Sequence, residues 1–141
     1  LTEEDDGIRL NGPSDGLKGL KVDMNDFSDQ ALTLAAIAPY ASSDVTITHI
    51  GHIRGQECDR LHAIVINLKN AGITCEEGDD WVCIHPGKPQ PCRIETFDDH
   101  RVAMAFAVMG LGCDGIEILN PGCCKKTFEN YFVVLDSLLK H

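Results

Sequence analysis

Hydrophobic residues along the chain occur either in short runs, as in strands, or at the three- and four-residue spacing of a helix face. Between residues 19 and 86 this pattern predicts strands at residues 20–23, 45–48, 73–76 and 81–85. One helix is expected after Ser28 and ends near Pro39, because proline helps to close a helix. Another is expected from Glu57 to Gly72, where glycine suits a left-handed cap. The last two strands flank a turn-rich segment typical of a hairpin, so the predicted order is βαβαββ.

The same order begins again in residues 91–141. The pattern there predicts strands at residues 92–96 and 116–119. One helix is expected to open at Asp98, and a last helix has Thr127 as its expected N-cap. The apolar stripe of the last helix, which we interpret as core, comprises Phe128, Tyr131, Phe132, Leu135, Leu138 and Leu139. We interpret the chain as two copies of one unit, preceded in residues 1–18 by the remnant of an earlier copy.

Length, charge and cysteine content narrow the class of protein. The 141 residues suit one compact domain, and the formal net charge of −10 argues against nucleic-acid or anionic-membrane binding, which needs a basic patch. No apolar run approaches the roughly 20 residues needed to cross a bilayer. The seven cysteines lack the repeated close spacing of a structural zinc site, and we expect reduced thiols, including the adjacent Cys123 and Cys124. These features predict a soluble, cytoplasmic protein.

Charged residues gather where a predicted strand leads into a predicted helix. In chain order they are Asp23, Glu57, Arg60, Arg101 and Lys126. Helix N-termini attract anions and disfavour cations, so the cations among these residues suggest a bound anionic ligand. The alternative is local ion pairing, worth about 0 to 1 kcal/mol at an exposed site. Arg60 would then pair with Glu57 or Asp59, and Arg101 with one of the aspartates at residues 98–99. Spacing alone leaves both interpretations open.

Four segments in register with the repeat resemble the 5-enolpyruvylshikimate-3-phosphate (EPSP) synthase family. They are DMND at residues 23–26, RGQECDRL at residues 54–61, TFDDHRVAM at residues 96–104 and KTF at residues 126–128. Each motif alone is a weak signal, but four in this order and spacing are specific. The other enolpyruvyl transferase family, which acts on UDP-N-acetylglucosamine, shares the fold but does not usually combine Glu-x-Asp-Arg with Lys-Thr-Phe.

The resemblance implies a role for each of the five charged residues. Asp23 would contact shikimate-3-phosphate and accept the proton of the hydroxyl that attacks phosphoenolpyruvate. Glu57 would exchange a proton at the enolpyruvyl methylene carbon, a role that requires desolvation. Arg60, Arg101 and Lys126 would bind phosphoenolpyruvate, the arginines through planar guanidinium groups and the lysine as a point charge. The resemblance implies no cofactor and no metal.

Shikimate-3-phosphate binding is where the sequence departs from the family. His52 stands where many members have asparagine, and Gln56 stands where most have lysine. The resemblance still places both residues, with Asp23, at the shikimate-3-phosphate site. Gln56 can hydrogen-bond a hydroxyl but brings no charge, and we interpret the change as variation within a subfamily.

The family fold implies an α/β architecture of repeated βαβαββ units, with buried parallel helices and short strands outside. Each family member has two domains of three units, with the substrates between them. This chain would supply about two units of one domain, at residues 19–86 and 91–141, and the missing N-terminal part of the same enzyme would complete the site. The fragment alone is therefore expected to be inactive. The alternative is a noncatalytic module that binds an anion or a partner protein, although such a module does not need Asp23 and Glu57.

Overall fold

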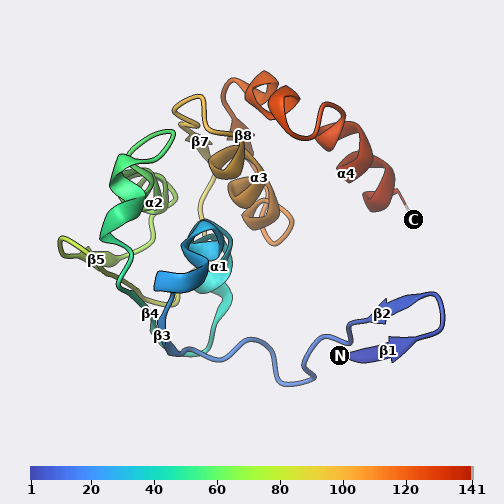
Figure 1. Cartoon of the computed structure of the whole chain (residues 1–141), viewed down its shortest axis with the longest axis horizontal. Helices are drawn as coiled ribbons and strands as arrows, with labels where there is room; N and C mark the ends of the chain where they lie inside the picture. Colours follow the sequence, from blue (N-terminus) through green and yellow to red (C-terminus); the bar gives the residue numbers. More distant parts are fainter. Residues whose placement is uncertain (141) are drawn as a thin grey trace.

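The computed structural model describes residues 1–140, and the larger part of it is one complete βαβαββ unit (Figure 1). Its strands are β3 (Lys21–Asp23), β4 (Val45–Thr48), β5 (Cys75–Glu77) and β6 (Val82–Ile84). Its helices are α1 (Ala31–Ile37) and α2 (Arg60–Asn70). Short 3-10 turns flank them: η1 (Asn25–Gln30), η2 (Ala38–Tyr40) and η3 (Gly51–Gly55). The predicted order of elements in this unit is confirmed.

The four strands form one sheet in the order β3-β4-β6-β5. β3 and β4 run parallel, with α1 in the connection between them, and the other neighbours run antiparallel. Because alternate residues of a strand point to opposite faces, the aliphatic residues of β4 and β6 reach the core. These side chains are at most 1% exposed and comprise Val45, Ile47, Val82 and Ile84. The residues between them, Thr46 and Cys83, are partly exposed on the other face.

The second unit repeats only the first four elements of that order, βαβα. β7 (Cys92–Ile94) and β8 (Ile116–Ile118) pair in parallel as a separate two-stranded sheet, with α3 (His100–Met109) in the connection between them. The turn η4 (Pro121–Lys126) then leads to α4 (Tyr131–Leu139). His141, with which the predicted second unit ends, lies outside the described residues.

α1, α2 and α3 contact one another and carry most of the core. Ile64, Leu68 and Phe106 are fully buried, and burial of such a side chain stabilises the fold by about 1.5–3 kcal/mol. Leu34 is partly buried. Buried alanines at the helix contacts, among them Ala35, let the backbones approach closely. β5 and β7 contact α2, and β8 contacts α3. Central helices under short strands, rather than one continuous sheet, are as predicted.

Two helices begin later than predicted because an aspartate caps each one. α2 begins at Arg60 and not at Glu57, since Asp59 Oδ1 accepts a hydrogen bond from the His62 backbone N–H at 2.9 Å. α3 begins at His100 and not at Asp98.

The residues before α3 explain its late start. Phe97 and Asp98 have φ values of 52° and 56°, which a right-handed helix does not allow. Asp99 then caps the helix by accepting from the Arg101 backbone N–H at 2.9 Å. The main chain therefore turns sharply before the first helical residue.

The last helix differs most from the prediction. It begins at Tyr131, with Asn130 as its N-cap residue, whereas Thr127 ends the preceding 3-10 turn. Tyr131 and Phe132 are partly buried against a small cluster around Cys123 and Cys124. Leu135 is also partly buried, whereas the other three residues of the stripe are exposed, Phe128 at 41%, Leu138 at 67% and Leu139 at 61%. The interpretation of the whole stripe as core is therefore wrong.

The N-terminal segment lies apart from the helices (Figure 1). β1 (Thr2–Glu4) and β2 (Gly7–Arg9) form an antiparallel hairpin whose residues are all exposed. An isolated two-stranded hairpin has marginal stability, so this segment adds little to the folded unit that follows.

The sequence predicted no apolar run long enough to cross a bilayer, and it predicted reduced cysteines. No helix within residues 1–140 is long and apolar enough to cross a membrane. All seven cysteines are free, and the neighbouring Cys123 and Cys124 are buried as small apolar side chains.

Candidate functional site

Four of the five charged residues singled out from the sequence come together where α2 and α3 begin. Lys126 Nζ lies 3.9 Å from Glu57 Oε2. Arg60 and Arg101 share one acceptor, because Arg60 Nη1 lies 3.0 Å from Asp29 Oδ1 and Arg101 Nη2 lies 3.1 Å from Asp29 Oδ2. These contacts join η1, α2, α3 and η4, which are far apart in the sequence.

Arg60 is the buried member of the group, with its side chain 4% exposed. Its Nε donates to Asp99 Oδ2 at 2.7 Å and its Nη2 to Asp99 Oδ1 at 3.3 Å. Its Nη1 donates to Asp29 and, at 2.6 Å, to Gln56 Oε1. A buried guanidinium with this many acceptors has a fixed orientation, and loss of one acceptor would leave charge without a partner.

Asp99 is the fully buried carboxylate of the site. Burial alone would raise the pKa of Asp99, but hydrogen bonds from the Arg60 side chain and the Arg101 backbone, with the Arg60 charge, hold that pKa below its ordinary value. The Cys58 thiol donates to Asp99 at 3.5 Å, and burial together with the Asp99 charge raises the pKa of Cys58 to about 12. Cys58 therefore remains an unreactive thiol at neutral pH.

The local ion pairs considered from the sequence do not form in the described residues. Arg60 pairs with Asp29 and Asp99 instead of Glu57 or Asp59, and Arg101 also pairs with Asp29. Asp29 is thus a residue that sequence reasoning missed, and Asp99 was considered only as a partner of Arg101 and not of Arg60. An aspartate beside a helix start is an ordinary capping residue, so the sequence carried no signal that distinguished either of them.

Arg54 fixes the loop that carries Gln56 and Glu57. Its Nη1 binds both carboxylate oxygens of Asp59 at 3.1 and 3.2 Å. Its Nη2 reaches Glu77 Oε2 at 3.3 Å and the Gly78 carbonyl at 3.0 Å, and its Nε donates to the Asp79 carbonyl at 3.1 Å. This arginine therefore joins the N-cap of α2 to the β5–β6 turn.

Asp23, the fifth residue, lies just before η1. Asp23 Oδ1 accepts from the Asn25 backbone N–H at 2.9 Å, and Asp23 Oδ2 lies 2.8 Å from His49 Nδ1. The hydrogen bond from Asn25, followed by that of His49, lowers the pKa of Asp23. Within residues 1–140 no hydrogen bond or ion pair joins Asp23 directly to Glu57 or to the three cations.

The turn η1 connects Asp23 to the group formed by the other four charged residues. His52 Nε2 lies 2.7 Å from Ser28 Oγ, and the next residue of the turn, Asp29, holds the two arginines. Asn25 at the start of the same turn binds Asp23. A six-residue turn thus contacts Asp23, His52 and both arginines.

His100 marks a position suited to a ligand. Its side chain is 11% exposed, and its Nδ1 is buried without a hydrogen-bond partner, 3.8 Å from Glu57 Oε2. Buried polar atoms without a partner are rare and mark places where water or a ligand binds. Glu57, Asp99 and His100 bring one possible metal-ligating atom each within 4.8 Å. A metal ion there would compete with Arg60 for Asp99, so the set suits a polar ligand better than a cation.

Comparisons with known proteins identify the family to which the chain is similar. The model of the EPSP synthase (3-phosphoshikimate 1-carboxyvinyltransferase) family matches residues 1–135. A 3-phosphoshikimate 1-carboxyvinyltransferase of Nostoc punctiforme is 48% identical over 140 residues, which are 99% of this chain and 33% of that protein. The chloroplastic enzyme of the same name from Arabidopsis thaliana is 41% identical over 126 residues, covering 89% of this chain and 24% of that protein.

The solved structures give the same result. An EPSP synthase structure from Acinetobacter baumannii superposes with a TM-score of 0.79 at 26% identity, over 86% of this chain and 30% of that one. The chain spans about a quarter to a third of the length of the curated relatives that it matches. On the family match, the relatives and the fold together, this chain belongs to the EPSP synthase family.

Proposed function

We propose that this chain is part of an enzyme that transfers the enolpyruvyl group of phosphoenolpyruvate to the 5-hydroxyl of shikimate-3-phosphate and releases phosphate, a step of the shikimate pathway. The observation that carries the proposal is the gathering of Glu57, Arg60, Arg101 and Lys126 from distant elements. Phosphoenolpyruvate has a carboxylate and a phosphate beside the carbon that exchanges a proton. Three cations and one carboxylate in one place suit these groups.

The two arginines provide the anion-binding part of the proposed site. Arg60 donates a hydrogen bond to the carboxylate of Asp29, whose side chain is 47% exposed, and Arg101 forms an ion pair with the same carboxylate. Two guanidinium groups that converge on one carboxylate would bind the carboxylate or phosphate of a ligand in the same way. Lys126, 58% exposed, would neutralise the phosphate that departs.

The two carboxylates would move the protons. The oxygen of the shikimate-3-phosphate hydroxyl attacks the central carbon of phosphoenolpyruvate while Asp23, whose lowered pKa keeps it ionised, accepts the hydroxyl proton. Glu57 gives a proton to the methylene carbon in this step. Return of a proton from that carbon to Glu57, with departure of the phosphate and transfer of the Asp23 proton to it, restores the double bond and both carboxyl groups. His52 and Gln56 would contact shikimate-3-phosphate, and the Gln56 amide N–H groups are oriented to donate because its oxygen already accepts from Arg60.

The degree of exposure of the site supports a role for further protein outside this chain. Glu57 is 42% exposed and Lys126 is 58% exposed, whereas proton transfer at carbon requires that water be excluded. We therefore include in the proposal that residues 19–86 and 91–141 are two of the three units of one domain. The remainder of the same enzyme would close over the substrates, in the cytoplasm, and the 141-residue chain alone would have no synthase activity.

A chimera tests the proposal. The chain would replace the matching third of the Nostoc punctiforme relative, with which it is 48% identical, and synthase turnover would be measured as phosphate release that depends on both substrates. We expect turnover by the chimera and none by the isolated chain. In the chimera, Glu57→Gln should abolish turnover and leave substrate binding largely intact, because the amide keeps the shape and loses the proton. Arg101→Ala should weaken phosphoenolpyruvate binding by roughly 2 to 5 kcal/mol.

Matched variants distinguish loss of chemistry from loss of structure. Glu117→Gln changes an exposed glutamate on β8 that pairs with Arg93, and it should leave turnover unchanged. A folded chimera that binds both substrates without turning them over would favour the alternative of a noncatalytic module. Normal turnover by the Glu57→Gln chimera would remove Glu57 from the mechanism.

A further inference from the structure

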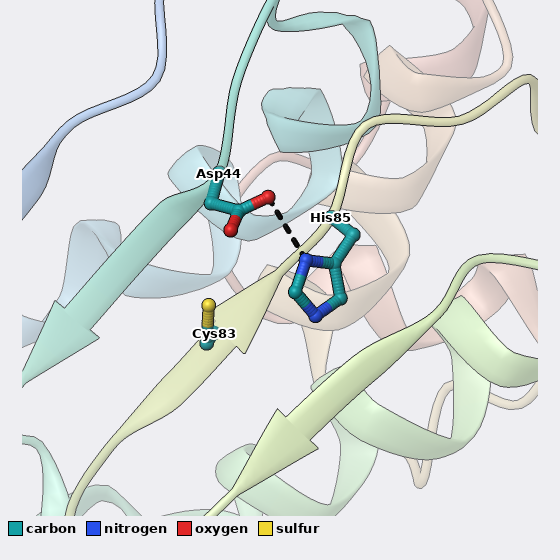
Figure 2. A group of neighbouring side chains, drawn as sticks. All are labelled: Asp44, Cys83 and His85. Carbon is teal, nitrogen blue, oxygen red and sulfur yellow. Dashed lines mark hydrogen bonds and ion pairs between the residues drawn. The ribbon is translucent and has the colours of Figure 1, made fainter.

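The outer face of the four-stranded sheet carries a second cluster of side chains that can ligate a metal, Asp44, Cys83 and His85 (Figure 2). β4 and β6 run antiparallel, with Val45 opposite Ile84. Those two residues point into the core, so the residues on either side of them point outward. Asp44, just before β4, and His85, just after β6, therefore meet on the outer face, and Cys83 lies on the same face two residues before His85.

The three side chains are close enough to share one ion. One ligand atom from each lies within 4.8 Å of the others. His85 Nδ1 lies 2.9 Å from Asp44 Oδ1, and Cys83 Sγ accepts a hydrogen bond from Thr46 Oγ1 at 3.4 Å. Bonds of about 2.0 to 2.3 Å in a tetrahedral zinc site place ligand atoms roughly 3.3 to 3.8 Å apart. Small side-chain rotations on this partly open face would bring the three atoms to those separations.

Glu76 supports His85 from the neighbouring strand. Glu76 on β5 lies opposite Cys83 in the sheet, and its Oε1 is 3.8 Å from His85 Nε2. A metal-bound imidazole usually donates its second N–H to a carboxylate, which fixes the ring and increases the basicity of the binding nitrogen. With Nδ1 directed at Asp44 and Nε2 directed at Glu76, His85 has the orientation of such a ligand.

We propose that Asp44, Cys83 and His85 form a binding site for one thiophilic divalent cation such as Zn²⁺, with Glu76 as the carboxylate behind His85. Thiolate, imidazole and carboxylate are the ligands that zinc takes in proteins, whereas Mg²⁺ and Ca²⁺ take oxygen ligands. Three protein ligands leave a fourth position for water. Sequence pattern does not reveal the site, because no repeated close spacing of cysteines marks it and Asp44 lies far from Cys83 and His85 in the sequence, just before β4.

The test is a Zn²⁺ titration of the purified 141-residue chain in competition with a chromophoric chelator. We expect one Zn²⁺ per chain, and a loss of affinity of at least about tenfold in Cys83→Ser and in His85→Gln, the size found when metal-site partners are removed. Cys113→Ser and His62→Gln serve as matched controls, because Cys113 is a partly buried thiol after α3 and His62 is exposed on α2. Both controls should bind Zn²⁺ as the unchanged chain does.

A Co²⁺ titration gives a second readout. Binding through Cys83 should produce thiolate-to-cobalt charge-transfer absorption that Cys83→Ser lacks and Cys113→Ser retains. Asp44→Asn changes an exposed side chain with little risk to folding, and it should also weaken Zn²⁺ binding. The proposal is overturned if the unchanged chain binds no Zn²⁺, or if folded Cys83→Ser, His85→Gln and Asp44→Asn bind it with unchanged affinity. In either case Asp44 and His85 are a surface ion pair only.

Discussion

The two repeated units begin in the same way with different side chains. In each unit a residue with positive φ follows the second strand, His49 at 56° in the first and Asn120 at 48° in the second. Each binds an aspartate at or beyond the end of the first strand of its unit, His49 to Asp23 at 2.8 Å and Asn120 to Asp98 at 3.1 Å. The repeat is therefore preserved as a main-chain bend and a cross-connection, and the residues that make the connection are free to differ.

The units end differently. The first continues into β5 and β6, whose apolar residues close its core. The second continues into α4, which has no fully buried residue, and a hollow of about 540 Å³ remains between α3, β8, η4 and α4. Stability should therefore be concentrated in the first unit and in the contact that α3 makes with it.

The largest expected effect concerns the ion pair that joins the units. Asp99→Ala should lower the free energy of unfolding by about 3 to 5 kcal/mol, because it removes one partner of a buried charge pair and a helix cap. Urea denaturation of the 141-residue chain would measure this. Asp114→Ala, at an exposed aspartate of the second unit, should change stability by less than about 0.5 kcal/mol. Equal effects of the two variants on the free energy of unfolding would show that burial of the Arg60 charge does not require Asp99 as its partner.

The next effect compares the same substitution in the two units. Leu68→Ala removes a fully buried side chain of α2 and should cost about 2 to 5 kcal/mol. Leu138→Ala removes a side chain of α4 that is 67% exposed, and it should cost less than about 0.5 kcal/mol. Thermal and urea unfolding of both variants would measure the difference. A large loss in Leu138→Ala would mean that α4 packs far more tightly than its exposure indicates.

The smallest effect is a pH dependence. The pKa of Asp99 is lower in the folded chain than in the unfolded chain, so its contribution to stability is complete above the unfolded pKa. That contribution is lost as the pH falls through the folded pKa. Asp99→Asn should therefore flatten the acid side of the curve of unfolding free energy against pH, whereas Asp114→Asn should keep the slope of the unchanged chain. An unchanged slope in Asp99→Asn would assign the acid sensitivity to other carboxylates.

Local pattern predicted most of the fold because periodicity is a local property. The spacing around Ile64 and Leu68 predicted both the helix and its buried face, and the order of elements followed from such stretches. Helix starts were less predictable, because a cap such as Asp59 competes with the helix itself for the first turn. The positive φ at Phe97 depends on packing that the sequence does not display.

The candidate site was predictable in its residue types and not in their partners. Arg60 and Arg101 stood out as cations where helices begin, but their acceptor Asp29 lies in a different element. The exposure of α4 could not be predicted from the sequence either, since an apolar stripe has the same spacing whether or not another surface covers it. Such pairings depend on tertiary structure, which short-range pattern does not report.

The hydrogen bonds of Arg54 have a consequence for the conformational entropy of ligand binding. Ordering the backbone of one residue costs about 1 to 2 kcal/mol of entropy, and a loop that becomes ordered only around its ligand loses that much affinity for each such residue. Arg54 holds the loop before α2 at Asp59 and at the β5–β6 turn. The entropy of placing Glu57 is therefore lost when the chain folds, and a ligand bound at the proposed site would meet a carboxylate whose main chain is already ordered.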